Sequence, residues 1–186
     1  REQIGEIRRL LMEGSVEKAS FLAKMALTST PKYNNPYQPA GDLRLCFMGH
    51  NAPAQEYRRC LLLPEGVALV EYTMNGVRYR REMFVSLAYQ VGVIRLTADR
   101  KGAVTVSANM SRKPFEEHTG RLDEKTVGNW GENGVGGVRY FTGVRMTADA
   151  PVHTMGDFVY TEQASEVILY LDTETDFTEY VGRRQN

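Results

Sequence analysis

The sequence predicts a mainly β protein, a β-sandwich of antiparallel sheets that follows an N-terminal αα-hairpin. Residues 67–85 carry the clearest signal, because two runs of strand-forming residues flank Asn75-Gly76, a dipeptide that favours a two-residue type I′ turn. After residue 41, short segments of alternating polar and apolar residues follow one another without helical patterns between them. Strands joined by hairpins rather than by helices are typical of an antiparallel sheet pair.

The predicted helical hairpin occupies residues 1–27. Residues 2–13 place apolar side chains at a period of about 3.6 residues, which indicates an amphipathic helix. Gly14 can end this helix in a left-handed conformation, and Ser15 can cap the next one. The second helix is expected to end near Leu27 and to carry an apolar face of Val16, Ala19, Ala23, Ala26 and Leu27. We expect the pair to pack on a sheet.

A loop rich in proline and tyrosine, residues 28–41, separates the helices from the strands of residues 42–172. Within the strands, the turn at Asn75-Gly76 predicts three facing pairs, which are Met74 with Val77, Tyr72 with Tyr79, and Glu71 with Arg80. Residues 111–137 contain several glycines and many charges with little periodicity, and they predict a long loop. Residues 173–186 are polar and predict a linker-like tail. We therefore expect residues 1–186 to form a single, partial domain.

Composition excludes several classes of function. Lys+Arg and Asp+Glu number 23 each, so the formal net charge is zero, and no basic block indicates nucleic acid. The apolar runs are too short to span a membrane. Arg1 in place of a Met suggests a processed or excised chain, so the compartment is left open. Cys46 and Cys60 could form a disulfide if residues 42–47 and 56–63 pair as a hairpin, although two buried thiols are the commoner arrangement.

No catalytic motif is present in the sequence. The clusters that resemble metal ligands lack a third ligand at a suitable spacing and are better explained as surface charges: Glu116, Glu117 and His118, or His153 and Asp157. There is no Gly-x-Ser-x-Gly elbow, and the glycines at 134–137 lead into a strand rather than a phosphate-binding helix. Coincidental carboxylate pairs are expected among 23 acidic residues. We therefore predict no catalytic residue, no metal ligand and no cofactor.

Two groups of residues are candidates for sugar binding. Trp130 lies between Asn129 and Gly131 in a glycine-rich stretch, so its flat ring, beside hydrogen-bonding residues, could stack on a sugar. The alternative role of Trp130 is to anchor the predicted loop as a local hydrophobic contact. The second group is Tyr37, Gln38 and Asp42, together with Tyr33. Its alternative role is packing between helix and sheet.

Several stretches taken together resemble the N-terminal domain of glycoside hydrolase family 95, the α-L-fucosidases and α-L-galactosidases. They are EIRRLLMEGSVEKASFLA, YQPAGDLRLCF with Ala40 where Leu is usual, EYRRCLLLPEGVALVEYTMNGVRYRREMFVS, VGVIRLTAD, GGVRYFTGVRM and ASEVILYLDTETDF. The resemblance implies a large sandwich followed by an (α/α)₆ barrel and a C-terminal β-domain. Hydrolysis in that family is inverting, and its catalytic residues lie in the barrel, so no residue here inherits a catalytic role.

The resemblance implies an accessory domain that is inactive alone. It would pack on the barrel and lend Tyr37, Gln38, Asp42 and Trp130 to a cleft for a fucosylated glycan, in a periplasmic or secreted enzyme. Family members begin with further strands before the helix pair, so this chain resembles an interior fragment. Missing strands leave unpaired edges, which favours an edge-strand homodimer. The alternatives are an independent carbohydrate-binding module and a structural self-association domain.

Overall fold

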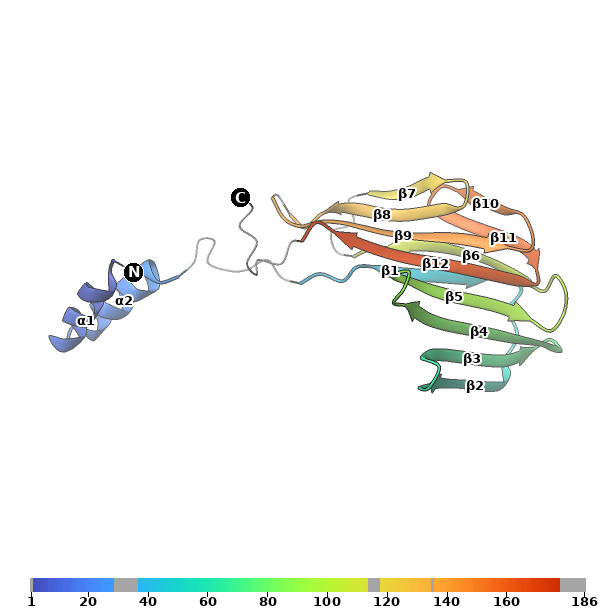
Figure 1. Cartoon of the computed structure of the whole chain (residues 1–186), viewed down its shortest axis with the longest axis horizontal. Helices are drawn as coiled ribbons and strands as arrows, with labels where there is room; N and C mark the ends of the chain where they lie inside the picture. Colours follow the sequence, from blue (N-terminus) through green and yellow to red (C-terminus); the bar gives the residue numbers. More distant parts are fainter. Residues whose placement is uncertain (1, 29–36, 114–117, 135, 178–186) are drawn as a thin grey trace. The chain divides into compact units, whose positions relative to one another are not determined.

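The computed structural model describes residues 2–28, 37–113, 118–134 and 136–177. The chain divides into two compact units, Arg1–Tyr37 and Gln38–Asn186, and each is described by itself (Figure 1). The described strands pair antiparallel and follow two short helices, so the predicted fold class is confirmed.

The first unit contains the predicted helix pair, α1 (Ile4–Met12) and α2 (Val16–Ala26). Gly14 separates them with a φ of +76°, which confirms the left-handed ending predicted at this glycine. Ser15 is the N-cap residue of α2, but its side chain makes no capping hydrogen bond. No described helix is long and apolar enough to cross a membrane. Packing of the pair on a sheet stays a prediction.

The second unit contains two antiparallel sheets. An eight-stranded sheet has the order β2-β3-β4-β5-β12-β9-β8-β7, and a four-stranded sheet has the order β1-β6-β11-β10. The strands are β1 (Asp42–Phe47), β2 (Gln55–Leu62), β3 (Val67–Met74), β4 (Val77–Ser86), β5 (Val91–Ala98), β6 (Val104–Ser111), β7 (His118–Asp123), β8 (Thr126–Glu132), β9 (Arg139–Ala148), β10 (Val152–Met155), β11 (Phe158–Ala164) and β12 (Glu166–Thr175).

The β3–β4 hairpin matches its prediction. Asn75 and Gly76 both have positive φ, at 51° and 70°, as a type I′ turn requires. The three predicted facing pairs all occur in the register of the two strands. Local sequence alone specified this hairpin, because the turn type sets the register.

The predicted long loop over residues 111–137 is wrong, since most of it is the β7–β8 hairpin. The backbone N–H of Lys125 donates to Asp123 Oδ1 at 2.7 Å, closing the turn between the strands. Gly120 and Gly128 face each other across the hairpin, so small residues hide the alternation that marks a strand. A Cβ at Gly128 would lie 2.7 Å from the Thr142 carbonyl oxygen, which explains why glycine stands there.

Two further expectations about the strands need correction. Residues 42–47 and 56–63 do not form a hairpin, because β1 pairs with β6 in one sheet and β2 pairs with β3 in the other. Cys46 and Cys60 are accordingly free thiols. Strand β12 also continues to Thr175, past the predicted start of the tail at residue 173.

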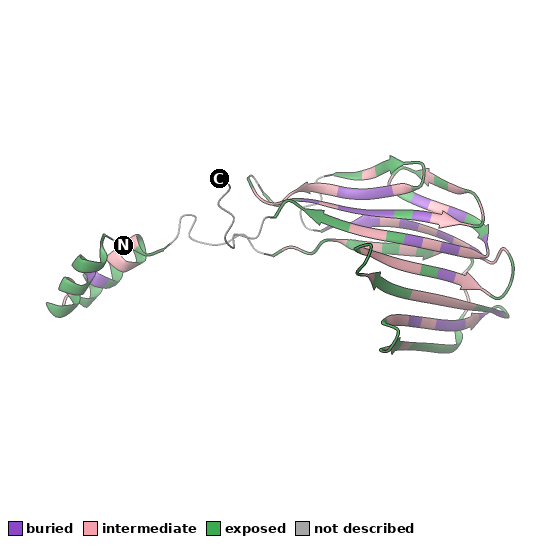
Figure 2. Ribbon diagram, in the orientation of Figure 1, coloured by how far each residue is buried: buried purple, intermediate pink, exposed green. Residues whose placement is uncertain are grey.

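The core lies between the sheets (Figure 2). Its fully buried side chains come from β5, β6, β8, β9, β11 and β12; they are Leu96, Val104, Val106, Ala108, Met110, Val127, Val144, Met146, Val159, Ala164, Val167 and Leu169. Residues of β1 pack against this cluster from the edge of the smaller sheet. The core therefore spans only part of the larger sheet.

Candidate functional site

The predicted residues Tyr37, Gln38 and Asp42 belong to the segment that enters β1. Asp42 is the first residue of β1 and lies opposite Ser111, the last residue of β6. Tyr37 and Asp42 are exposed, whereas Gln38 is half-buried. Gln38 and Asp42 therefore place polar groups at the start of β1. Tyr33, the fourth member of this predicted group, lies outside the described residues.

A buried arginine holds this segment in place. Arg112 is only 2% exposed, and its Nε donates to the Pro39 carbonyl oxygen at 2.8 Å. A terminal guanidinium nitrogen donates to Asn133 Oδ1 at 2.6 Å, and the guanidinium lies 3.6 Å from the ring centroid of Tyr140. A guanidinium stacked on a ring and hydrogen-bonded at its edge is well suited to fix a neighbouring backbone.

Two further contacts fix the backbone of the segment at Ala40 and Gly41. The Thr142 hydroxyl donates to the Ala40 carbonyl oxygen at 3.1 Å. Gly41 has a φ of +135°, and a Cβ there would lie 3.0 Å from the Ser111 carbonyl oxygen and 3.3 Å from Asn129 Nδ2. Only glycine combines this backbone conformation with such a close approach.

Asn129 lies directly under the segment and is completely buried. Neither its side-chain oxygen nor its side-chain nitrogen has a hydrogen-bond partner among the described residues, and the same holds for the Ser111 hydroxyl. Most buried polar atoms in native structures have a hydrogen-bond partner. Buried polar atoms without one therefore mark places where a polar side chain is kept although an apolar one would pack more favourably. The segment therefore packs against buried polar side chains, whereas the core cluster between the sheets is apolar.

Trp130 is not part of this arrangement. It lies on β8 rather than in a loop, is half-buried, and stacks on His118 of β7 with ring centroids 5.9 Å apart. Successive residues of a strand point to opposite faces, so Trp130 lies on the face away from Asn129. Gln38 and Asp42 thus lie in the segment at β1, Trp130 lies elsewhere on the second unit, and Tyr37 is the last residue of the first unit. A role in sugar binding stays a prediction for all four.

The anchoring residues Arg112, Asn129 and Thr142 were not predicted from the sequence. One signal was available for Arg112. The apolar side chains of β6 occupy the even positions from Val104 to Met110, so Arg112 continues the row that points into the core. A charged residue at an inward position indicates a buried polar contact, because an unpaired buried charge is too costly to keep.

An ion pair at the start of β9 keeps one carboxylate charged. Arg139 donates to Asp176 through both its backbone N–H and its Nε, each at 2.8 Å, and this holds the pKa of Asp176 below its usual range. A carboxylate kept ionised in this way is a poor general acid. Among the described residues, no group of three or more His, Cys, Asp or Glu side chains could hold a metal ion.

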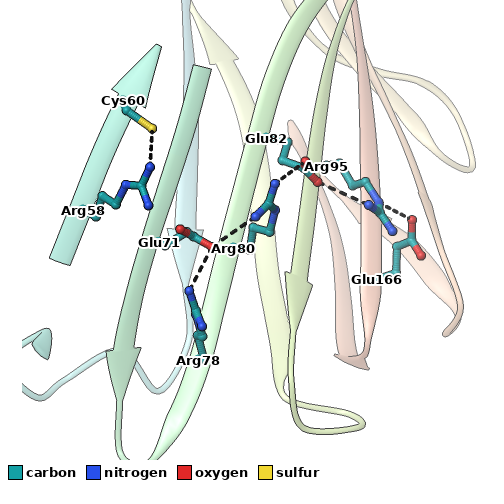
Figure 3. Close-up of polar contacts among 8 residues, drawn as sticks. All are labelled: Arg58, Cys60, Glu71, Arg78, Arg80, Glu82, Arg95 and Glu166. Atoms are coloured by element: carbon teal, nitrogen blue, oxygen red, sulfur yellow. Dashed lines mark hydrogen bonds and ion pairs between the residues drawn. The ribbon is translucent and has the colours of Figure 1, made fainter. Parts of the chain in front are cut away.

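The face of the larger sheet that points away from the core carries a row of ion pairs (Figure 3). Glu71, whose side chain is only 9% exposed, accepts from Arg78 at 3.3 Å and from Arg80 at 3.1 Å. The row continues across β4, β5 and β12 through Arg80–Glu82, Glu82–Arg95 and Arg95–Glu166. Such a row ties neighbouring strands together through charged cross-strand pairs.

Beside this row lies a hollow of about 590 Å³, lined by Phe84, Ser86, Tyr89, Val91, Val93, Arg95, Ile168 and Tyr170. Two of its polar side chains already have partners: Arg95 is paired with Glu82 and Glu166, and the Ser86 hydroxyl accepts from the Tyr89 N–H at 3.4 Å. Most of the lining is apolar or aromatic, so the hollow mainly offers apolar surface.

Comparisons with known proteins bear on the whole chain. A family model described as "Glycosyl hydrolase family 65, N-terminal domain" matches residues 1–180. Alpha-L-fucosidase 2 from Arabidopsis thaliana is 35% identical over 106 residues, which are 56% of this chain and 12% of that protein. A putative kojibiose phosphorylase from the human microbiome matches in structure with a TM-score of 0.45 and 10% identity, over 72% of this chain and 22% of that one; this likeness is too weak to support an argument.

The family model and the fucosidase match confirm the resemblance to the N-terminal β-sandwich of a glycoside hydrolase. The fucosidase is the kind of enzyme that the sequence motifs indicated, and the chain spans only about an eighth of its length. The matched family model is that of family 65 and covers nearly the whole chain. The chain therefore belongs to the N-terminal domain family of glycosyl hydrolase family 65.

Proposed function

We propose that this chain is the accessory N-terminal β-sandwich of an inverting α-L-fucosidase-type glycoside hydrolase. In this role it is inactive alone, packs on an (α/α)₆ barrel, and lends Tyr37, Gln38 and Asp42 to the cleft that holds a fucosylated glycan. The observation that carries the proposal is the anchored segment. Arg112 and Thr142 bind consecutive backbone carbonyls of the segment, while Tyr37 and Asp42 remain exposed.

Rigid support matters for such a role. A binding residue contributes most when its backbone is already held in the bound geometry, since less conformational entropy is then lost. The partial match to an α-L-fucosidase supports the substrate class. The apolar hollow on β4, β5 and β12 supports packing against another domain, because exposed apolar surface of this kind marks interaction sites.

The first experiment reads the gene beyond both ends of this chain and assays the purified chain against an aryl α-L-fucoside. The proposal expects an open frame that encodes a helical domain with a catalytic Glu, and no hydrolysis by the isolated chain. Hydrolysis that co-purifies with the chain through successive columns would contradict it, as would start and stop codons that closely bracket residues 1–186.

A second candidate, an independent carbohydrate-binding module, is favoured by the aromatic strip on the face of β7, β8 and β9. Trp130 lies opposite both His118 and Phe141 in the strand register. This function requires that Trp130→Ala abolish binding to immobilised fucosylated glycans while leaving the melting temperature nearly unchanged. If binding persists in that variant, the module is not using this strip.

A further inference from the structure

The sequence contains two Asn-Gly dipeptides, and the structure places them in different surroundings. They are Asn75-Gly76, between β3 and β4, and Asn133-Gly134, between β8 and β9. Asparagine is chemically labile, and a following glycine increases the lability, because the lack of a side chain lets the next backbone nitrogen approach the asparagine amide. The same reaction can therefore be compared in two settings of one chain.

The reaction is deamidation, a covalent modification that converts asparagine to an acid. The glycine nitrogen loses its proton and attacks Cγ of the asparagine; the amide C–N bond breaks, ammonia leaves, and a succinimide ring closes. A water molecule then opens the ring. Cleavage of the bond between the nitrogen and Cγ gives aspartate, whereas cleavage at the main-chain carbonyl carbon gives isoaspartate. The backbone of isoaspartate runs through the former side chain and is longer by a methylene group.

Nothing in the described structure restrains the peptide between Asn75 and Gly76. Both residues are exposed, and a β-carbon added at Gly76 would meet no atom within 4 Å. Neither the Asn75 side chain nor the Gly76 N–H forms a hydrogen bond with a described residue. Pairing of the two strands begins at Met74 and Val77, on either side of the dipeptide. The peptide can therefore rotate without losing a hydrogen bond of its own.

Rotation of this peptide brings the reacting atoms together. Asn75 and Gly76 have φ values of 51° and 70°, as in a type I′ turn. Rotating their shared peptide converts the turn into type II′, in which φ of the first residue stays positive and its ψ is about −120°. At this ψ the Gly76 nitrogen lies beside the Asn75 β-carbon, within reach of Cγ. Both turn types join strands through two residues, so the pair of Met74 and Val77 is kept.

The same rotation is blocked at Asn133-Gly134. The Gly134 N–H donates to the Glu132 carbonyl oxygen at 2.9 Å. The Asn133 N–H donates to the Val138 carbonyl oxygen, also at 2.9 Å. The Asn133 carbonyl oxygen is packed against the same loop, because a β-carbon at Gly137 would lie 2.1 Å from it. The peptide between Asn133 and Gly134 therefore has no room to rotate.

Arg112 fixes the side chain of Asn133 as well. A terminal guanidinium nitrogen of this buried arginine donates to Asn133 Oδ1 at 2.6 Å. A cationic donor at this oxygen makes Cγ more electrophilic, so Arg112 alone would not protect the amide. Protection comes from the restraint of the nucleophile, because the Gly134 nitrogen is held by Glu132 and cannot reach a side chain that Arg112 keeps in place.

We propose that Asn75 is a site of spontaneous deamidation in the folded chain, whereas the fold protects Asn133. The two products differ in their effect on the β3–β4 hairpin. Asp-Gly suits a type I′ turn as Asn-Gly does, so the aspartate product keeps the register. Isoaspartate lengthens a loop of only two residues, and because the turn sets the register, pairing at Met74 and Val77 is weakened. This inference is independent of the proposed enzymatic function.

The test follows both dipeptides in one sample of the full chain. The folded chain is incubated at mildly alkaline pH and digested, and the asparagine, aspartate and isoaspartate forms of each peptide are separated by liquid chromatography. Asn75 should be converted at least about tenfold faster than Asn133, because conversion at Asn133 requires several hydrogen bonds to open. In the urea-unfolded chain the two rates should be similar, since both asparagines precede Gly-Val. A rate ratio in the folded chain no larger than in the unfolded chain, or no conversion of Asn75 in the folded chain, would overturn the proposal.

Two variants separate the effects of the products on the hairpin. Asn75→Asp has the aspartate product from the start and should keep the melting temperature of the original chain. Asn75→Gly is the matched control, because Gly-Gly also suits a type I′ turn but has no side-chain amide to react. After incubation, hydrogen exchange at the Val77 amide should become faster in the original chain and stay unchanged in Asn75→Gly. Equal acceleration in both would contradict the proposed weakening of the hairpin by isoaspartate.

Discussion

Gly41 provides the sharpest test of how the segment before β1 is anchored. Gly41→Ala places a β-carbon at a φ of +135°, which an L-residue rarely adopts, and brings it to 3.0 Å from a backbone oxygen. The conformational strain alone is about 1–3 kcal/mol, and the crowding adds to it because the Ser111 backbone is held in the β1–β6 ladder. We expect the free energy of unfolding of the sandwich unit to fall by about 2–4 kcal/mol.

Urea unfolding followed by the fluorescence of Trp130 measures this change, because the chain contains a single Trp and it lies in the sandwich. At roughly 2–4 °C per kcal/mol for a unit of this size, the melting temperature should fall by about 4–16 °C. Gly156→Ala is the matched control, since Gly156 also has a positive φ of +60° but a β-carbon added there would meet no atom within 4 Å. If both variants lose the same stability, crowding against Ser111 does not anchor the segment.

Three further predictions concern the inner and outer faces of β3 and β4. Tyr72→Phe should lower the free energy of unfolding by about 1–3 kcal/mol, since the Tyr72 hydroxyl accepts from Arg81 at 2.6 Å and lies 3.1 Å from His50 Nδ1. Urea melts measure the change, and an unchanged midpoint would show that these hydroxyl contacts do not stabilise the fold. Burial, followed by the charge of Arg81, lowers the pKa of His50. The contribution of neutral His50 to stability is therefore complete above its ordinary pKa of 6.5 and is lost as the pH falls below that value. Urea melts between about pH 7.5 and about pH 5 should show this loss of stability, and His50→Gln should make the loss smaller. Glu71→Gln should lower the free energy of unfolding by about 1–2 kcal/mol, because Glu71 is buried between two arginines. Glu166→Gln, at the exposed end of the same row, should change the free energy of unfolding by no more than about 0.5 kcal/mol. Similar thermal shifts for the two variants would refute this ranking.

Whether a sequence prediction succeeded depended on how far apart in the chain the interacting residues lie. The β3–β4 hairpin and the ending of α1 at Gly14 were predictable, because turn residues and periodicity act over a few neighbours in the chain. The β7–β8 hairpin was missed because facing glycines and charges erase the alternation, although the turn at Asp123 specifies it locally. The segment at Tyr37 was recognised as a candidate, but not the residues that hold it.

The sequence by itself determined the fold class, the helix pair and the register of the β3–β4 hairpin, since these depend on local pattern. Only the tertiary structure decided which strands are neighbours, because alternation selects a face but not a partner. This is why β1 pairs with β6 rather than β2, and why Cys46 and Cys60 remain apart. Arg112 reaches a carbonyl 73 positions earlier in the chain, a contact that exists only once both sheets have assembled.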